Sequence, residues 1–257
     1  MKQTLIAALN ATLTDRMRQR IFNLAFNLSP AQFRLFAYRY AHAPMMDHGL
    51  MHLAGRGLMP RVIADVGGYD GNWARMARAV WPAAQIAIFE ANESKRQVLS
   101  RVATDIGADL HIALLGPEDG QERVFHVMES GSSVYAENSP LPRRREVRQT
   151  RRLDTLLAGT RVDFLKLDVQ GFEIEVLRGA EHALAGAQAV LMEVSLLQIN
   201  AGAPLFAEVV GFMAARGFVV CDVLELHRRP LDQATNQVDL LFVPEASPLM
   251  ADTRHFA

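Results

Sequence analysis

The chain has 257 residues, of which 50% are apolar and 21% are charged, and its formal net charge is −1. This length and composition predict one large core, so a single α/β domain with or without a helical appendage is the default. The near-neutral charge gives no overall attraction to nucleic acid. The single cysteine, Cys221, excludes a disulfide framework and a multi-cysteine zinc site. No apolar run reaches the roughly 18 residues of a membrane span, so we expect a cytoplasmic protein.

Residues 1–58 carry helical patterns, interrupted at Ser29-Pro30 and at Pro44. We expect them to form a helical N-terminal extension, followed by the main domain at residues 59–257. Aromatic residues recur along this extension at Phe22, Phe26, Phe33, Phe36 and Tyr40. They could form a lid over a substrate pocket, but such a stripe is more often core or a dimer contact. A homodimer through the N-terminal helices is therefore one expectation.

After Pro60 the pattern alternates between strands and helices. The predicted strands are 62–67, 85–90, 110–115, 162–168, 189–195, 218–225 and 238–243. The predicted helices are 72–80, 93–106, 173–185 and 204–216. This alternation predicts a mostly parallel sheet with right-handed crossovers. The last two strands have no helix between them, so they should pair antiparallel at one edge of the sheet.

A long insertion, residues 116–153, separates the third and fourth predicted strands. Asp119-Gly120 followed by Arg123 to Met128 indicates a β-hairpin. Residues 139–152 form an arginine-rich arm, with arginines at positions 143, 144, 145, 148, 151 and 152. These could contact a phosphate-bearing substrate or an acidic carrier protein, but a solvated strand face is the favoured interpretation.

The first predicted strand runs directly into a glycine-rich turn, GGYDGNW at residues 67–73. Glycines let the backbone approach a ligand that a Cβ would block, and the helix that follows offers free N–H groups. A dinucleotide loop needs the pattern G-x-G-x-x-G, but Tyr69 stands where its second glycine belongs. The turn therefore argues against NAD or FAD.

Two carboxylates accompany this turn. Asp65 precedes Gly67 by two residues, and Glu90 ends the second strand, where a carboxylate can accept both hydroxyls of a ribose. A carboxylate beside the glycines would repel phosphate but would suit an ammonium group. A ligand with a ribose and no phosphate matches both positions, and S-adenosylmethionine is such a ligand.

The fourth strand ends in Lys166 and Asp168 within VDFLKLDVQGFEIEVLRGA, residues 162–180. Ligands bind at the carboxyl ends of strands in open α/β sheets, so Asp168 is the first candidate for catalytic base or acceptor anchor. A turn-capping carboxylate is its alternative role. Lys166 could neutralise Asp168 as a salt-bridge partner or hold a substrate oxygen. Glu193, in an apolar run, is either catalytic or a buried partner of Lys166.

Other catalytic and metal-binding candidates are weaker. His126 and His227 could each serve as a base near neutral pH, but a satisfied histidine is the favoured interpretation for both. A magnesium site requires clustered carboxylates. The sequence provides only Asp168 and Glu193 as candidate ligands, so we predict no metal.

Three motifs resemble those of the FkbM-type methyltransferases, a branch of the class I fold that uses S-adenosylmethionine. They are DVGGYDGNW at 65–73, FEAN at 89–92 and KLDVQGFEIEVLRGA at 166–180. The departures are Gly68 for the family's alanine and Tyr69 for its usual asparagine. The resemblance implies a Rossmann-like, seven-stranded sheet in the order 3-2-1-4-5-7-6. The resemblance assigns Asp65, Gly67, Gly71 and Glu90 to the cofactor, with Asp168 facing its methionine end or the acceptor. We expect Gly68, Tyr69 and Ala91 to complete the cofactor-binding residues.

The resemblance also implies an activity, the methylation of a hydroxyl on a small acceptor such as a sugar, a polyketide or a peptide-derived product. The catalytic candidates are then Asp168, Lys166 and Glu193. A non-catalytic scaffold that binds partners is the alternative. A nucleic-acid methyltransferase is disfavoured because no N-P-P-Y type motif follows the fourth strand.

Overall fold

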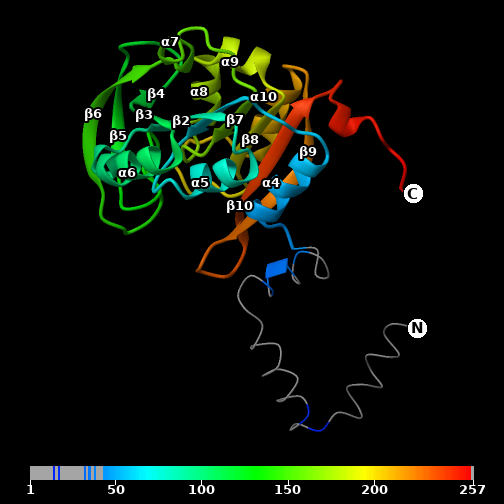
Figure 1. Ribbon diagram of the computed structural model, residues 1–257. Coiled ribbons are helices and arrows are strands. Elements are labelled where there is room, and N and C mark those ends of the chain that lie inside the picture. The colour runs from blue at the N-terminus through cyan, green and yellow to red at the C-terminus, as the bar shows by residue number, and fades with distance from the viewer. Residues whose placement is uncertain are drawn as a thin grey trace. The chain divides into compact units, whose positions relative to one another are not determined.

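The computed structural model describes Thr14, Met17, Gln32, Arg34, Leu35, Tyr38 and residues 43–255 (Figure 1). The chain divides into two compact units, residues 1–48 and 49–257. Most of the predicted helical extension lies outside the described residues, as do Phe22, Phe26, Phe33, Phe36 and Tyr40. Helix α4 (Met46–Gly55) is the first element of the extension whose bounds the structure gives. No helix within the described residues is long and apolar enough to cross a membrane.

The main sheet has seven strands within the described residues, in the order β3-β2-β1-β7-β8-β10-β9. They are β1 (Val62–Val66), β2 (Gln85–Glu90), β3 (Asp109–Ile112), β7 (Phe164–Leu167), β8 (Ala189–Ser195), β9 (Phe218–Arg228) and β10 (Thr235–Pro244). When the strands of this sheet alone are counted along the chain, the order reads 3-2-1-4-5-7-6. The predicted α/β fold and strand order are confirmed.

The strand directions decide which residues meet at the carboxyl edge of the sheet. Strands β3, β2, β1, β7 and β8 pair in parallel, whereas β10 is antiparallel to both β8 and β9. The predicted antiparallel pair at the sheet edge is thus confirmed. Because two antiparallel steps restore the direction, the end of β9 and the start of β10 lie at the same edge as the ends of β1, β7 and β8.

Helices cover both faces of the sheet, with α5 and α6 on one face and α8, α9 and α10 on the other (Figure 1). The helices and 3-10 turns after β1 are α5 (Asn72–Val80), η1 (Glu93–Lys95), α6 (Arg96–Ile106), α7 (Leu153–Leu156), α8 (Glu173–Arg178), α9 (Glu181–Gly186), α10 (Phe206–Ala214) and η2 (Pro248–Met250). The single helix predicted at 173–185 is wrong, because the chain breaks it at Gly179. A Cβ on Gly179 would lie 2.1 Å from the carbonyl oxygen of Gly116. Glycine at this break therefore allows the backbone at residue 179 to pack against the backbone at residue 116.

The insertion forms a second, smaller sheet in the order β4-β6-β5, made of β4 (Leu114–Leu115), β5 (Glu122–Val127) and β6 (Arg144–Arg151). Strands β5 and β6 pair antiparallel, as a hairpin insertion predicts, but residues 128–143 connect them, and the Asp119-Gly120 turn lies before β5. The strand predicted at 110–115 is divided between two sheets, because the Ala113 N–H bonds Glu90 in the main sheet and Leu114 pairs with Thr150. The arginine-rich arm is largely strand β6, whose outer face is exposed, as the 68% exposed Val147 shows.

The core lies between the sheet and its two helical layers. Strand β7 is buried along its whole length, as expected for a central parallel strand covered on both faces. On one face Phe164 packs edge-on against Trp73 and Trp81, with ring centres 5.8 and 5.5 Å apart. A rigid central pair of strands, β1 and β7, therefore carries the glycine turn and the Asp168 turn side by side.

Candidate active site

The glycine turn after β1 is fastened to its neighbours on both sides. The N–H groups of Gly67 and Gly68 donate to the carbonyl oxygen of Phe89, at 2.9 and 3.1 Å. Gly67 has a φ of 80°, and a Cβ there would lie 1.9 Å from the carbonyl oxygen of Asp168. Glycine at this position thus brings the turn after β1 into contact with the turn after β7.

Of the two departures from the loop that the sequence resembles, the structure gives a steric reason for Gly68 and shows a left-handed backbone at Tyr69. A Cβ on Gly68 would lie 2.4 Å from Cγ2 of Ile88, so alanine would not fit beside this isoleucine without a shift. Tyr69 has a left-handed φ of 48°, a conformation that asparagine adopts more readily than tyrosine. Two contacts hold it: the Tyr69 N–H donates to Glu90 at 2.9 Å, and the Lys95 ammonium lies 4.2 Å from the ring centre.

Glu90 stands at the end of β2, between the glycine turn and the 3-10 turn that follows. Its Oε2 accepts from the N–H of Tyr69, and its Oε1 accepts from the N–H of Asn92 at 2.6 Å. A carboxylate has about four acceptor sites, so each oxygen keeps capacity for another donor. Glu90 is 8% exposed and lines the crevice, so that remaining capacity faces the cavities.

Asp65 has a different environment from Glu90. It is fully buried, and neither of its carboxylate oxygens has a hydrogen-bond partner within the described residues. Its charge is balanced by the Lys166 ammonium, 3.2 Å from Oδ1, which also donates to the Gly67 carbonyl at 2.8 Å. Burial raises the pKa of Asp65, and Lys166 opposes that rise. Of the predicted acidic pair, Glu90 lines the crevice and Asp65 does not.

Lys166 joins Asp65 to the turn after β7, because its ammonium also lies 3.6 Å from Oδ2 of Asp168. Burial alone would lower the pKa of Lys166, but the carboxylates of Asp65 and Asp168 raise it above its ordinary value. Such an ammonium keeps its proton at neutral pH. Lys166 is therefore an ion-pair partner of both carboxylates, and the pair with Asp168 is the salt bridge weighed from the sequence.

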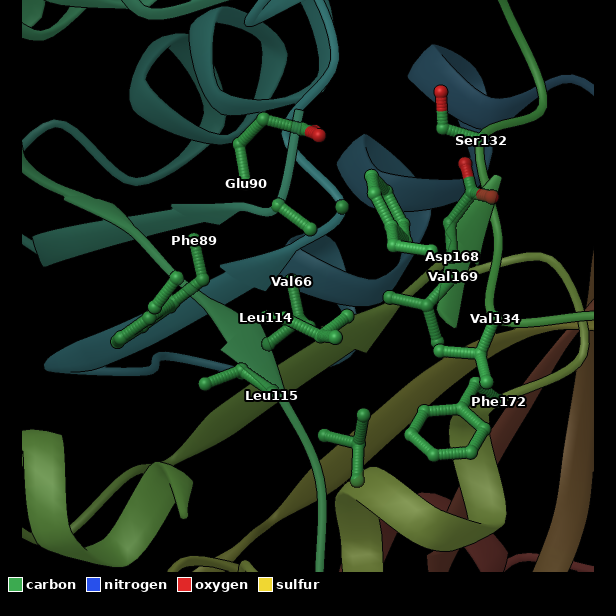
Figure 2. Close-up of a pocket in the computed structure, with 15 residues that line it drawn as sticks. Val66, Phe89, Glu90, Leu114, Leu115, Ser132, Val134, Asp168, Val169 and Phe172 are labelled. Atoms are coloured by element: carbon green, nitrogen blue, oxygen red, sulfur yellow. The ribbon is translucent and has the colours of Figure 1, made fainter. Parts of the chain in front are cut away.

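The crevice consists of two adjoining cavities that share Gly67, Glu90, Ser132 and Asp168. The other residues around the mainly apolar cavity are Val66, Phe89, Ala91, Ala113, Leu114, Leu115, Phe125, Val134, Val169, Phe172 and Val176. The polar cavity is completed by Tyr69, Asn92, Lys95, Ser130, Gly131 and Gln170. Figure 2 shows Glu90 and Asp168 on opposite sides of the apolar cavity, with Leu115 and Phe172 below them.

The segment between β5 and β6 contributes a wall of the crevice that no sequence motif indicates. The Asn92 side-chain amide donates to the Met128 carbonyl at 3.3 Å and to the Ser132 hydroxyl at 3.4 Å. The Ser133 hydroxyl donates to the Gln170 carbonyl at 2.8 Å. The insertion thus bridges the ends of β2 and β7. Lys95 was also missed, because a lysine at the start of a helix resembles an ordinary surface charge.

A polar network extends from Asp168 along the edge of the sheet. Asp168, whose side chain is 34% exposed, accepts from the Gln170 amide at 3.0 Å. The same amide nitrogen donates to Glu193 at 2.5 Å, and so does that of Gln237, also at 2.5 Å. Glu193 therefore pairs with two amides, whereas the sequence suggested Lys166 as its partner. Burial, together with the nearby carboxylates, raises the pKa of Glu193 well above its ordinary value.

The two histidine candidates lie in different places. His227 Nε2 lies 2.7 Å from Asp239 and 3.7 Å from Glu193, so this side chain ends the polar network on β9. Its hydrogen bond to Asp239 raises the pKa of His227. His126, on β5, lines neither cavity, and burial lowers its pKa. Within the described residues no group of three or more histidine, cysteine or acidic side chains could hold a metal ion.

Comparisons with solved structures find similarity to several methyltransferases. A putative O-methyltransferase from Klebsiella pneumoniae is 14% identical, over 94% of this chain and 95% of that one, with a TM-score of 0.47. The O-methyltransferase TomG from Streptomyces achromogenes, solved in complex with SAM, is 16% identical, over 81% and 86%, with a TM-score of 0.44. A putative RNA methyltransferase from Pyrococcus horikoshii is 13% identical, over 77% and 82%, with a TM-score of 0.46.

These likenesses concern the fold alone, and no curated protein matches the sequence. The family assignment rests on the sequence itself. The model of the methyltransferase FkbM domain matches residues 65–220, more than half of the chain, so the protein belongs to the FkbM methyltransferase family.

Proposed function

We propose that this methyltransferase uses S-adenosylmethionine and methylates a hydroxyl group of a small acceptor. The observation that carries the proposal is the pair of carboxylates, Glu90 and Asp168, that line one crevice together with Gly67. Carboxylates repel phosphate and accept hydrogen bonds from hydroxyl and ammonium groups. A nucleoside without phosphate, carrying an amino acid, has the groups that this crevice can satisfy.

The chemistry of the lining residues fits each part of that cofactor. Glu90, held by two backbone N–H groups, would accept the ribose hydroxyls. The apolar cavity beside Leu115 and Phe172 would take the adenine ring. Lys95 supplies a cation for the cofactor carboxylate, and Asp168 faces the ammonium end or the acceptor. Asp65 would act indirectly, through Lys166 and the Gly67 carbonyl that Lys166 fixes.

When bound, the cofactor supplies a methyl group that its sulfonium centre makes electrophilic. The work left to the protein is to hold the acceptor oxygen in line and to exclude water, which can contribute about 7 kcal/mol or more. A hydroxyl acceptor must also lose its proton, and the exposed part of Asp168 is our candidate to take it. Lys166 keeps the opposite face of that carboxylate neutralised.

We propose a sugar, a polyketide or a peptide-derived product as the acceptor. The polar cavity is lined by hydroxyl, amide and carboxylate groups, which suits an acceptor with several hydroxyls. The N-terminal extension is proposed as a dimer contact. The absence of metal from the reaction remains a prediction.

Calorimetry with S-adenosylhomocysteine tests the cofactor assignment. We expect micromolar binding to the wild-type chain and an affinity at least tenfold lower for Glu90→Ala, because the ribose hydroxyls lose their acceptor. Glu122→Ala, on the exposed start of β5, is the matched control and should bind as the wild type does. Absence of binding to the wild type at high micromolar ligand would favour the non-catalytic scaffold.

A further inference from the structure

The backbone of Gln170 is held in a conformation that side chains seldom adopt. Its φ is 56°, in the left-handed region, and Gly171 follows with a φ of 99°. Strain of this kind persists where the surroundings fix it and often marks a functional position. Gln170 lines the polar cavity, next to Asp168.

Three contacts fix this turn. Glu173 Oε1 accepts from the N–H of Val169 at 2.9 Å and from the N–H of Gly171 at 3.1 Å. The Ser133 hydroxyl donates to the Gln170 carbonyl at 2.8 Å. The backbone on both sides of Gln170 is thus fastened, so the direction of its side chain is set by the fold.

The side-chain amide of Gln170 stands between two carboxylates. Its nitrogen lies 3.0 Å from Oδ1 of Asp168 and 2.5 Å from Oε1 of Glu193. The pairing of β7 with β8 and of β8 with β10 brings Asp168, Glu193 and Asp239 to neighbouring positions on the sheet edge. The carboxylates of Asp168 and Asp239 repel that of Glu193. A neutral amide with two N–H donors satisfies the first two carboxylates at once.

The side-chain amide of Gln237, on β10, contacts both Glu193 and Gln170. Gln237 donates to Glu193 at 2.5 Å and lies 3.4 Å from the amide oxygen of Gln170. The orientation of the Gln170 amide is therefore fixed at both ends, with its nitrogen toward the carboxylates. On the far side of Asp168, the Lys166 ammonium lies 3.6 Å from Oδ2.

We infer that Gln170 is a positioning residue for the methyl-transfer reaction: its amide fixes the carboxylate of Asp168 toward the acceptor, using Glu193 as a buried anchor. The inference rests on the proposed function for the role of Asp168. It assigns Glu193 an indirect part, in which it holds Gln170 and makes no contact with the acceptor. A carboxylate at position 170 would be repelled by those of Asp168 and Glu193, which explains why this residue carries an amide.

Gln233 supplies a matched control, because it is an exposed glutamine with the same left-handed backbone, at a φ of 62°. Gln170→Gly and Gln233→Gly remove the same side chain and the same backbone strain. Gln170→Met keeps the volume of the side chain and removes the two donors. Because glycine suits a positive φ, the Gln170→Gly chain should fold even where the methionine variant does not.

Crystal structures of the three variants, determined with and without S-adenosylhomocysteine, give the direct readout. We expect the Asp168 carboxylate to leave its wild-type position in both Gln170 variants and to keep it in Gln233→Gly. Calorimetry should show S-adenosylhomocysteine affinities within threefold of wild type for all three. With an acceptor found by screening methyl glycosides, kcat should fall at least tenfold in the Gln170 variants while the KM for the cofactor changes less than threefold.

An Asp168 carboxylate that stays in place in Gln170→Gly and Gln170→Met would overturn the inference, whatever the rates. So would equal rates in Gln170→Gly and Gln233→Gly. Failure of the wild-type chain to bind S-adenosylhomocysteine would instead count against the proposed function. The structures without ligand would still report whether Gln170 positions Asp168.

Discussion

Glu173 shows how one buried side chain makes the site turn sensitive to pH. Its carboxylate is 3% exposed and accepts the N–H groups on either side of Gln170. Burial raises the pKa of Glu173 to about 7, from 4.5. The folded chain therefore binds a proton over a pH range in which the unfolded chain has lost it. The stability that this proton contributes is complete below about pH 4.5 and is lost as pH rises through about 7.

Glu173→Gln should remove this dependence, because the glutamine oxygen can accept the same two N–H groups without ionising. We expect equal free energies of unfolding for variant and wild type near pH 4.5. Near pH 8 the variant should be more stable by roughly 3.5 kcal/mol, from 2.5 pKa units at about 1.4 kcal/mol each. Urea unfolding at several pH values measures both curves, with Glu122→Gln at the exposed start of β5 as the control. Parallel curves for Glu173→Gln and wild type would refute the assignment.

The geometry of the site depends on contacts between residues that are distant in the sequence. The end-of-strand motifs identified Glu90 and Asp168 as lining residues, because apolar runs that end in a carboxylate mark the carboxyl edge. The register that pairs Asp65 with Lys166 is a property of the sheet, so the burial of Asp65 could not be foreseen. Gln170 was missed for the same reason, since its partner Glu193 lies on another strand.

At the scale of elements, the turn after β1 and the turn after β7 form one packed unit. Gly67 has no room for a side chain, since its Cβ would lie 1.9 Å from the Asp168 carbonyl. Gly57 is also left-handed, with a φ of 99°, but nothing lies within 4 Å of its Cβ position. Alanine substitutions at these two positions therefore distinguish the free-energy cost of backbone strain alone from that of strain together with a steric clash.

Gly57→Ala should lower the free energy of unfolding by about 1 kcal/mol, the cost of left-handed backbone in an L-residue. Gly67→Ala should lower it by about 3 kcal/mol or more, because the two turns must also move apart. Affinity for S-adenosylhomocysteine should fall at least tenfold in Gly67→Ala and stay unchanged in Gly57→Ala. Denaturant unfolding and calorimetry provide both measurements, and equal effects of the two changes would contradict the packing argument.

Periodicity predicted the strands well and the helix ends less well. Apolar runs of four to seven residues fix where a buried parallel strand lies, so β1, β2 and β8 agree with prediction to within one residue. The breaks at Gly179 and Ala113 depend on neighbours distant in sequence, Gly116 and Thr150. The local sequence pattern carries no information about such contacts. It therefore predicts one continuous helix at 173–185 and one continuous strand at 110–115.

At the scale of the whole molecule, the described residues that line the crevice belong to one of the two units. The residues that line both cavities all lie between Val66 and Val176, and the polar network extends to Asp239. The core of this unit also includes Leu50 and Leu53, which are fully buried. We predict that residues from about 43 onward suffice to form the cofactor site.

A chain that begins at residue 43 tests this division, because it keeps all of α4 and removes most of the N-terminal unit. We expect it to fold and to bind S-adenosylhomocysteine within threefold of the full chain. Sedimentation should show that the full chain forms a dimer and the shortened chain a monomer, if the aromatic residues of the extension form the dimer contact. A dimer that survives the deletion would place the contact on residues 43–257. Loss of ligand binding in a folded, shortened chain would show that the N-terminal residues complete the crevice.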